Sequence, residues 1–160
     1  LAGVGVLTAS SYVSVPMLPV PITLQTLAVI LVGALAGPRT GLVMIVSWLS
    51  LAAAGFPVLA DGKSSLAAFV GPTAGFLLAF PVAGFLAGVM VRSLARGHVS
   101  RFASFLGLHA FILFAGWAWL ATLIGADQAF AVGVAPFLIG AVIKSGLGTA
   151  IYALFAARTR

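Results

Sequence analysis

The stretch from Pro136 to Lys144, with the sequence PFLIGAVIK, opens the last apolar segment of the chain and contains an isolated lysine. If a helix begins at Pro136, Lys144 lies about 12 Å along it, because an α-helix rises about 1.5 Å per residue. An ionisable group at that depth in a bilayer is costly and usually functional. We therefore expect a helical bundle that holds Lys144 in a pocket.

The composition of the whole chain supports a membrane environment. Its 160 residues are 62% hydrophobic and only 6% charged, with a mean hydropathy of +1.25. A soluble domain is roughly 45–50% apolar and about 25% charged. The apolar runs are continuous, whereas the strands of a membrane barrel alternate at every second residue. The sequence therefore predicts a single all-α integral membrane domain over residues 1–160.

Six apolar segments are separated by polar or proline-rich stretches. The first segment is shorter than the roughly 20 residues that span a bilayer, and it starts with leucine, so we expect the beginning of its helix to be missing. Three prolines predict a stiff extended loop over residues 14–23, and residues 55–70 form the longest loop. Asp127 marks a predicted turn. The six predicted helices cover 1–13, 24–37, 40–54, 72–95, 102–124 and the segment from Pro136 onward.

The charged residues orient these six helices. The connections after the second and fourth predicted helices and the end of the chain carry only arginines. The connections after the third and fifth predicted helices carry one lysine and both acids. Because cytoplasmic loops are rich in Lys and Arg, we expect both termini in the cytoplasm. The formal net charge is +6, but the basic residues stand singly at segment ends rather than together on one face. This arrangement excludes a nucleic-acid-binding surface. The predicted inner residues are Arg39, Arg92, Arg96, Arg101, Arg158 and Arg160, and the predicted outer ones are Asp61, Lys63 and Asp127.

The sequence lacks the side chains that enzyme and metal sites require. It contains no cysteine, two histidines and two acids, too few for a metal cage or a hydrolytic triad. Gly62, Lys63 and Ser64 imitate the end of a phosphate-binding loop, but Pro57 stands where that motif needs glycine. His109 fits a hydrogen-bonded core residue better than a metal ligand. We predict that the chain is not an enzyme and binds no metal.

Small residues four positions apart recur along the segments. Such pairs let helix backbones approach closely in lipid, and internal packing explains most of them. Gly5 and Ala9 allow a second interpretation. Their small side chains leave a smooth face on the first helix, which is a candidate docking site for a partner helix. The pairs assigned to internal packing are Gly33 with Gly37, Gly71 with Gly75, and Gly84 with Gly88.

Lys144 has two interpretations. Its side chain can extend to the headgroups, as lysines near helix ends do, or it can face inward beside an anion or a strong acceptor. A depth of about 12 Å is large for the first arrangement. Both acids of the chain lie in predicted outer loops, so neither is an obvious partner for an inward-facing Lys144. A ligand with a carboxylate or a urea-like carbonyl is a natural partner for its ammonium group.

Several motifs resemble the BioY family, the biotin-capturing subunits of energy-coupling-factor (ECF) vitamin transporters. They are PITLQTLAV from Pro21, GALAGPR from Gly33, GFPV from Gly55, GPTAGF from Gly71, and the stretch that ends at Lys144. The resemblance implies six helices in the bacterial cytoplasmic membrane and biotin bound near the outer face. It also implies two kinds of partner, a transmembrane coupling protein of the EcfT or BioN type and ATP-binding subunits of the EcfA or BioM type.

The resemblance also assigns Lys144 as a biotin contact. It implies an acid three residues earlier, where this chain has Ala141, and Asp61 is the candidate substitute. Biotin has an apolar body with polar ends, which suits an apolar cleft with a few polar groups. The alternatives are a subunit for another small vitamin and a structural membrane subunit without a ligand. The predicted ligand-binding residues are Gln25, Asp61, Lys63, Thr73, Phe76, Trp117 and Lys144, with residues 14–23 as part of a lid.

Overall fold

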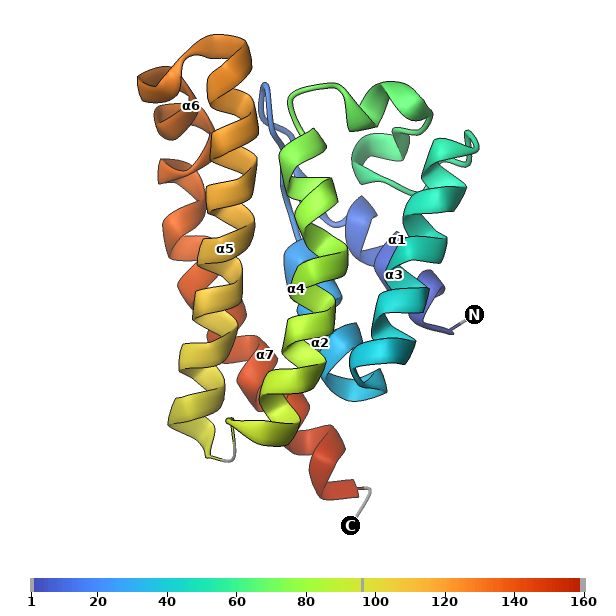
Figure 1. Cartoon of the computed structure of the whole chain (residues 1–160), viewed down its shortest axis with the longest axis vertical. Coiled ribbons are helices and arrows are strands. Elements are labelled where there is room, and N and C mark those ends of the chain that lie inside the picture. The colour runs from blue at the N-terminus through green and yellow to red at the C-terminus, as the bar shows by residue number, and fades with distance from the viewer. Residues whose placement is uncertain (1, 96, 159–160) are drawn as a thin grey trace.

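A computed structural model describes residues 2–95 and 97–158, with the side chains of 2–95 and 97–156 (Figure 1). Seven α-helices lie in this part of the chain. They are α1 (Ala2–Tyr12), α2 (Gln25–Ala36), α3 (Pro38–Ala53), α4 (Ala74–Ser93), α5 (His98–Ile124), α6 (Ala126–Gly133) and α7 (Leu138–Arg158). Short 3₁₀ turns occupy η1 (Ala60–Gly62), η2 (Leu66–Phe69) and η3 (Ala135–Phe137).

The six predicted helices are all present, but the segment between the last two differs from the prediction. Asp127 does not mark a simple turn, because it lies in the first turn of α6. Gly125 separates α5 from α6 with a φ of 87°, a conformation that glycine adopts without steric cost. Pro136 lies in η3, so the last helix begins two residues later, at Leu138.

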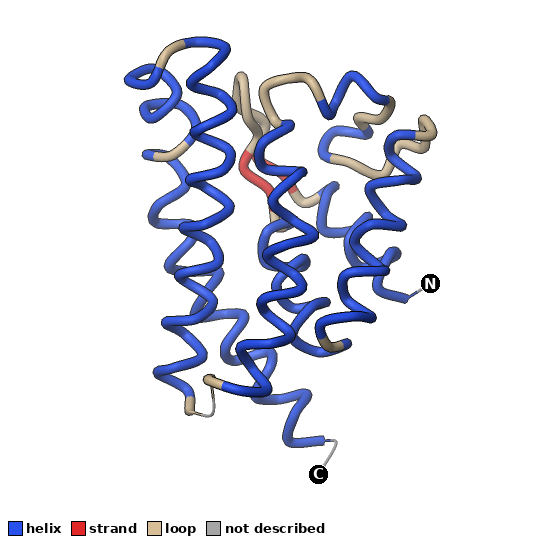
Figure 2. The backbone as a smooth tube through the Cα atoms, in the orientation of Figure 1, coloured by secondary structure: helices blue, strands red, loops and turns tan. Residues whose placement is uncertain are grey.

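Residues 14–23 form a β-hairpin rather than the predicted extended loop (Figure 2). Strand β1 (Ser14–Val15) pairs antiparallel with β2 (Ile22–Thr23). The three prolines lie between the strands, where no ladder N–H is needed. Each strand has only two residues, so the alternation that identifies a strand in sequence has no room to appear.

Gly33, Gly75, Gly84 and Gly88 lie at helix crossings, as predicted, whereas Gly37 and Gly71 lie in the connections before α3 and α4. A Cβ on Gly33 of α2 would collide with the backbone of Gly84 on α4, and a Cβ on Gly88 would meet the backbone of Pro38. A Cβ on Gly75 would likewise meet α5. The backbones of α2 and α4 are therefore in direct contact, which is the packing that small residues permit in membrane proteins.

The outer surface of the bundle is apolar. Three helical stretches are long and apolar enough to cross a membrane, namely Ala74–Ser93, His98–Ile124 and Ala126–Ala156, whereas α2 and α3 are shorter apolar helices. Large apolar side chains are exposed on α5 and α7, including Phe114, Ile143 and Phe155. Such a surface matches a hydrocarbon environment. The chain is thus an α-helical membrane protein, and the count of six crossings stays a prediction.

The charges of the described residues divide between the two ends of the bundle. The α2–α3 and α4–α5 turns lie together at the lower end of Figure 1, opposite the hairpin, η1 and α6. Arg92 lies beside Gly37 at this end, and the Arg101 guanidinium lies 4.7 Å from the centre of the Tyr152 ring. The division matches the predicted charge asymmetry. Leu1, Arg96 and Arg160, and the side chain of Arg158, lie outside the described residues.

Candidate functional site

A cavity of about 340 Å³ lies at the hairpin end of the bundle. Its wall is built from the hairpin between Pro19 and Thr23, the start of α2, residues 59–73, and helices α4, α5 and α7. Known small-molecule sites span about 300–1,000 Å³ and have mainly apolar walls. This cavity fits that description, because its large lining side chains are Leu59, Phe76, Leu77, Phe80, Leu113 and Phe137.

Lys144 faces this cavity from α7 and is only 9% exposed. Its ammonium donates hydrogen bonds to the main-chain oxygen of Thr23, at 2.5 Å, and to Oγ1 of Thr26, at 3.1 Å. A lysine has three N–H donors, so one remains for another acceptor. The inward orientation agrees with the prediction, and the side chain does not extend to the headgroups.

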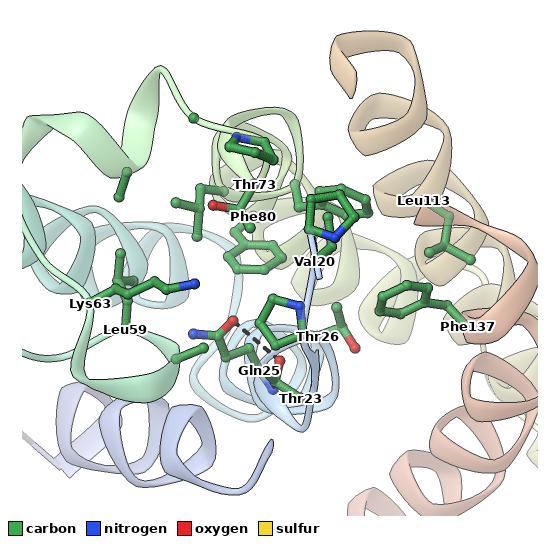
Figure 3. Close-up of a pocket in the computed structure, with 18 of the residues that line it drawn as sticks. Val20, Thr23, Gln25, Thr26, Leu59, Lys63, Thr73, Phe80, Leu113 and Phe137 are labelled. Atoms are coloured by element: carbon green, nitrogen blue, oxygen red, sulfur yellow. Dashed lines mark hydrogen bonds between the residues drawn. The ribbon is translucent and has the colours of Figure 1, made fainter. Parts of the chain in front are cut away.

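Gln25 also lines the cavity, but the ends of its side chain are engaged by protein. Its Oε1 accepts from Oγ1 of Thr23, at 3.2 Å (Figure 3). Its Nε2 donates to Oγ of Ser11 on α1, at 2.9 Å. Ser11 in turn donates to the main-chain oxygen of Leu7. A buried chain of hydrogen bonds therefore joins α1, the hairpin and α2 beneath the cavity.

Lys63 reaches the same cavity from the turn after η1. Its side chain extends toward the centre, across from Leu113 and Phe137 (Figure 3). The turn is closed by hydrogen bonds from the N–H of Leu59 to the oxygen of Lys63, at 3.2 Å, and from the N–H of Lys63 to the oxygen of Ala60, at 3.1 Å. Thus Lys63, Thr73 and Phe76 join Gln25 and Lys144 around one space.

Two predicted ligand residues, Asp61 and Trp117, do not line this cavity. Asp61 has a φ of 58°, and its Oδ1 accepts a hydrogen bond from Oγ of Ser14, at 3.0 Å. Trp117 donates its indole N–H to the oxygen of Ala126, at 3.1 Å. Both side chains therefore hold connecting segments together at this end of the bundle.

The remaining two tryptophans act in the same way. Trp48 on α3 donates its indole N–H to the oxygen of Val58, and Trp119 on α5 donates to the oxygen of Gly71. These two bonds secure both ends of the segment that carries Lys63. The tryptophans are thus anchors of the cavity wall rather than part of its lining.

Comparison with known proteins is consistent with this architecture. A sequence profile of the BioY family matches residues 1–160. The chain belongs to the BioY family. A probable biotin transporter BioY of Pyrococcus horikoshii is 38% identical to it over 92% of this chain and 88% of the relative. The biotin transporter BioY of Rhizobium etli is 37% identical over 83% of this chain and 76% of the relative.

A solved structure extends the similarity to three dimensions. The crystal structure of the S-component for biotin from an ECF-type ABC transporter superposes with a TM-score of 0.86 at 26% identity, covering 98% of this chain and 87% of that one. The BioY fold is thus confirmed for this chain. Membership of the BioY family also agrees with the prediction that the chain is a transport protein and not an enzyme.

This BioY-family chain lacks an acid at Ala141, which is buried one turn before Lys144. The candidate substitute, Asp61, is outside the cavity lining. Among the lining residues described, the oxygen acceptors are therefore main-chain carbonyls, the Gln25 amide and the hydroxyls of Thr26, Thr73 and others. Any N–H group of a ligand would have to be recognised by neutral oxygen atoms.

His109 is a buried core residue of this BioY-family chain, as the sequence favours. Its Nδ1 lies 2.9 Å from the oxygen of Phe105 and 3.1 Å from Oγ of Ser145. Because a carbonyl only accepts, the first contact assigns the proton to Nδ1. Nε2 is buried without a hydrogen-bond partner among the described residues. His109 therefore joins α5 to α7 and does not line the cavity.

Sequence reasoning missed Thr26 and Phe80 as lining residues. Phe80 follows Phe76 by four positions, which places both on one face of α4, so helical periodicity could have found it. Thr26 lies inside the quoted PITLQTLAV motif. Its contact with Lys144 has no local signal, because it depends on how α2 and α7 are packed.

Proposed function

We propose that this chain is the biotin-binding membrane subunit of an ECF-type vitamin uptake transporter. The observation that carries the proposal is the mainly apolar cavity with Lys63 and Lys144 facing it, in a member of the BioY family. The relatives cited above are described as biotin transporters, and the superposed structure as an S-component for biotin.

The chemistry of biotin suits this cavity. The bicyclic body and aliphatic chain are apolar, and they match the phenylalanine and leucine side chains of the wall. The ureido carbonyl is a strong acceptor that can receive the third N–H of Lys144. The ligand is biotin itself, and no cofactor takes part within this subunit.

The transport cycle we propose has three steps. The subunit captures biotin from outside, reorients against a coupling protein of the EcfT or BioN type, and releases biotin inside. ATP hydrolysis by EcfA-like or BioM-like subunits drives the reorientation. The charge distribution supports this direction of transport, because the cavity lies opposite the α2–α3 and α4–α5 turns, and the adjoining helix ends carry Arg39, Arg92 and Arg101. The proposed location is the bacterial cytoplasmic membrane, with both termini inside.

The proposed contact with the coupling protein lies on α1. Gly5 and Ala9 are exposed, and a Cβ on Gly5 would meet nothing within 4 Å. Together with the exposed Val6 they form a smooth strip on which the backbone of another helix can pack closely. The strip is separate from the cavity lining, so ligand and partner have distinct sites.

Calorimetric titration of the detergent-purified subunit tests this function. We expect biotin to bind at one site and to raise the melting temperature, because a ligand stabilises the folded state to which it binds. Thiamin and riboflavin should give no signal. Binding of one of these vitamins in place of biotin would instead indicate a subunit for another vitamin. Flat titrations with co-purifying partner subunits would indicate a structural role.

A further inference from the structure

The charge of the cavity is unbalanced. Two lysines line it, and neither of the two acids of the chain does. Uncompensated ammonium groups at an enclosed site favour an anionic ligand, because the opposite charge offsets the cost of removing them from water. The two lysines differ in their surroundings, and this difference decides which of them would contact the anion.

The ammonium of Lys144 is already coordinated. It is buried and donates two of its three N–H groups to oxygen atoms of Thr23 and Thr26. One donor remains, which is suited to a single neutral acceptor. A carboxylate at this depth would also have to lose its own hydration, which disfavours the charged group there.

The ammonium of Lys63 is free. It makes no hydrogen bond or ion pair with any of the described residues, and Asp61, two positions away, is engaged with Ser14. Lys63 is exposed while lining the cavity, so a carboxylate beside it keeps part of its hydration. The closed turn and the Trp48 anchor fix the backbone from which Lys63 extends.

We propose that Lys63 is the carboxylate anchor of this site and selects acids over their neutral derivatives. The ligand then lies with its carboxylate toward residues 59–63 and its neutral polar ring system toward Lys144. This inference rests on the proposed function, since it assigns the two ends of biotin to the two lysines.

Biotin and its uncharged methyl ester are the probes that test the assignment. Titrated into the purified wild-type subunit at neutral pH, biotin should bind roughly tenfold to a hundredfold more tightly than the ester, because a hydrogen bond to a charged group contributes about 1.5–3 kcal/mol. Lys63→Gln should weaken biotin binding by that factor and leave the ester affinity nearly unchanged. Lys63→Arg should keep the preference.

Two further variants serve as controls. Arg39→Gln removes the same charge from an exposed position in the first turn of α3, outside the cavity lining, and it should keep the wild-type preference. Lys144→Gln should weaken biotin and ester to a similar extent. Melting temperatures measured in parallel show that each variant is folded.

The outcomes separate this inference from the function on which it rests. A wild-type subunit that binds neither probe contradicts the proposed function. A wild-type subunit that binds both equally contradicts only the role of Lys63. That role is also overturned if Lys63→Gln keeps the preference, if it weakens both probes alike, or if Lys144→Gln abolishes the preference instead.

Discussion

The ammonium of Lys144 on α7 donates a hydrogen bond to the main-chain oxygen of Thr23, a residue 121 positions earlier in the chain. Thr23 ends the hairpin, and the second acceptor, Thr26, lies in the first turn of α2. One side chain therefore ties the last helix to the hairpin and α2 while it faces the cavity. Its removal is expected to affect both ligand binding and stability.

Lys144→Ala should weaken biotin binding by about tenfold or more, since it removes a donor at the cavity wall. The fold should survive, because Thr23 and Thr26 keep other contacts within the hairpin and α2. Titration calorimetry measures the affinity, and a thermal melt confirms folding. Unchanged affinity in a folded variant would show that Lys144 is not a ligand contact.

Gln25→Leu should lower the free energy of unfolding by about 1–3 kcal/mol, because it leaves the buried hydroxyl of Ser11 without its donor. The double variant Gln25→Leu with Ser11→Ala should recover part of the loss, since removing both partners costs less than removing one. Melting temperatures in detergent provide the measurement. A double variant less stable than either single one would argue against this hydrogen bond as the cause.

Gly33→Ala should destabilise the bundle by about 1–3 kcal/mol, the usual cost of overpacking, because its Cβ would meet the backbone of Gly84. Gly140→Ala is the matched control: Gly140 is also helical, and a Cβ there would meet nothing within 4 Å. The control should be neutral or slightly stabilising. Equal melting temperatures for the two variants would contradict the close crossing of α2 and α4.

Trp119→Phe should weaken biotin binding modestly, because it removes the indole N–H that holds Gly71 in the cavity wall. A neutral hydrogen bond contributes about 0.5–1.5 kcal/mol, which corresponds to roughly two- to tenfold in affinity. Trp117→Phe also loses one indole hydrogen bond, but to Ala126 outside the lining, so its affinity should match wild type. A larger loss of biotin affinity in Trp117→Phe than in Trp119→Phe would indicate that Trp117 contacts the ligand after all.

Gly5→Leu combined with Ala9→Leu should prevent assembly with the coupling protein while leaving biotin affinity intact, since both residues lie on the exposed face of α1. Co-purification with a tagged coupling protein measures assembly, and calorimetry measures binding. Gly107→Leu on α5 is a control at another open position and should assemble normally. Normal assembly of the α1 variant would show that this strip is not part of the interface with the coupling protein.

Sequence reasoning predicted the features that depend on composition and local spacing. Lys144 is identifiable because one charge interrupts an apolar run, and the glycine pairs because helix crossings need small residues. The hairpin was not predictable, since its strands have two residues each. Asp61 and Lys63 are neighbours in sequence, but only Lys63 lines the cavity, because the positive φ angles of Asp61 and Gly62 reverse the chain between them.

The crossing at Gly33 and Gly84 also fixes how α2 and α4, two helices of the cavity wall, lie relative to one another. At this crossing main chain lies against main chain, so no side chain there could change rotamer and let the two helices shift. Residues 55–65 are held differently, by hydrogen bonds such as those of Tyr12 to the oxygen of Pro57, of Ser14 to Asp61 and of Trp48 to the oxygen of Val58. The cavity is therefore bordered both by helices fixed through main-chain contact and by a loop fixed through individual hydrogen bonds.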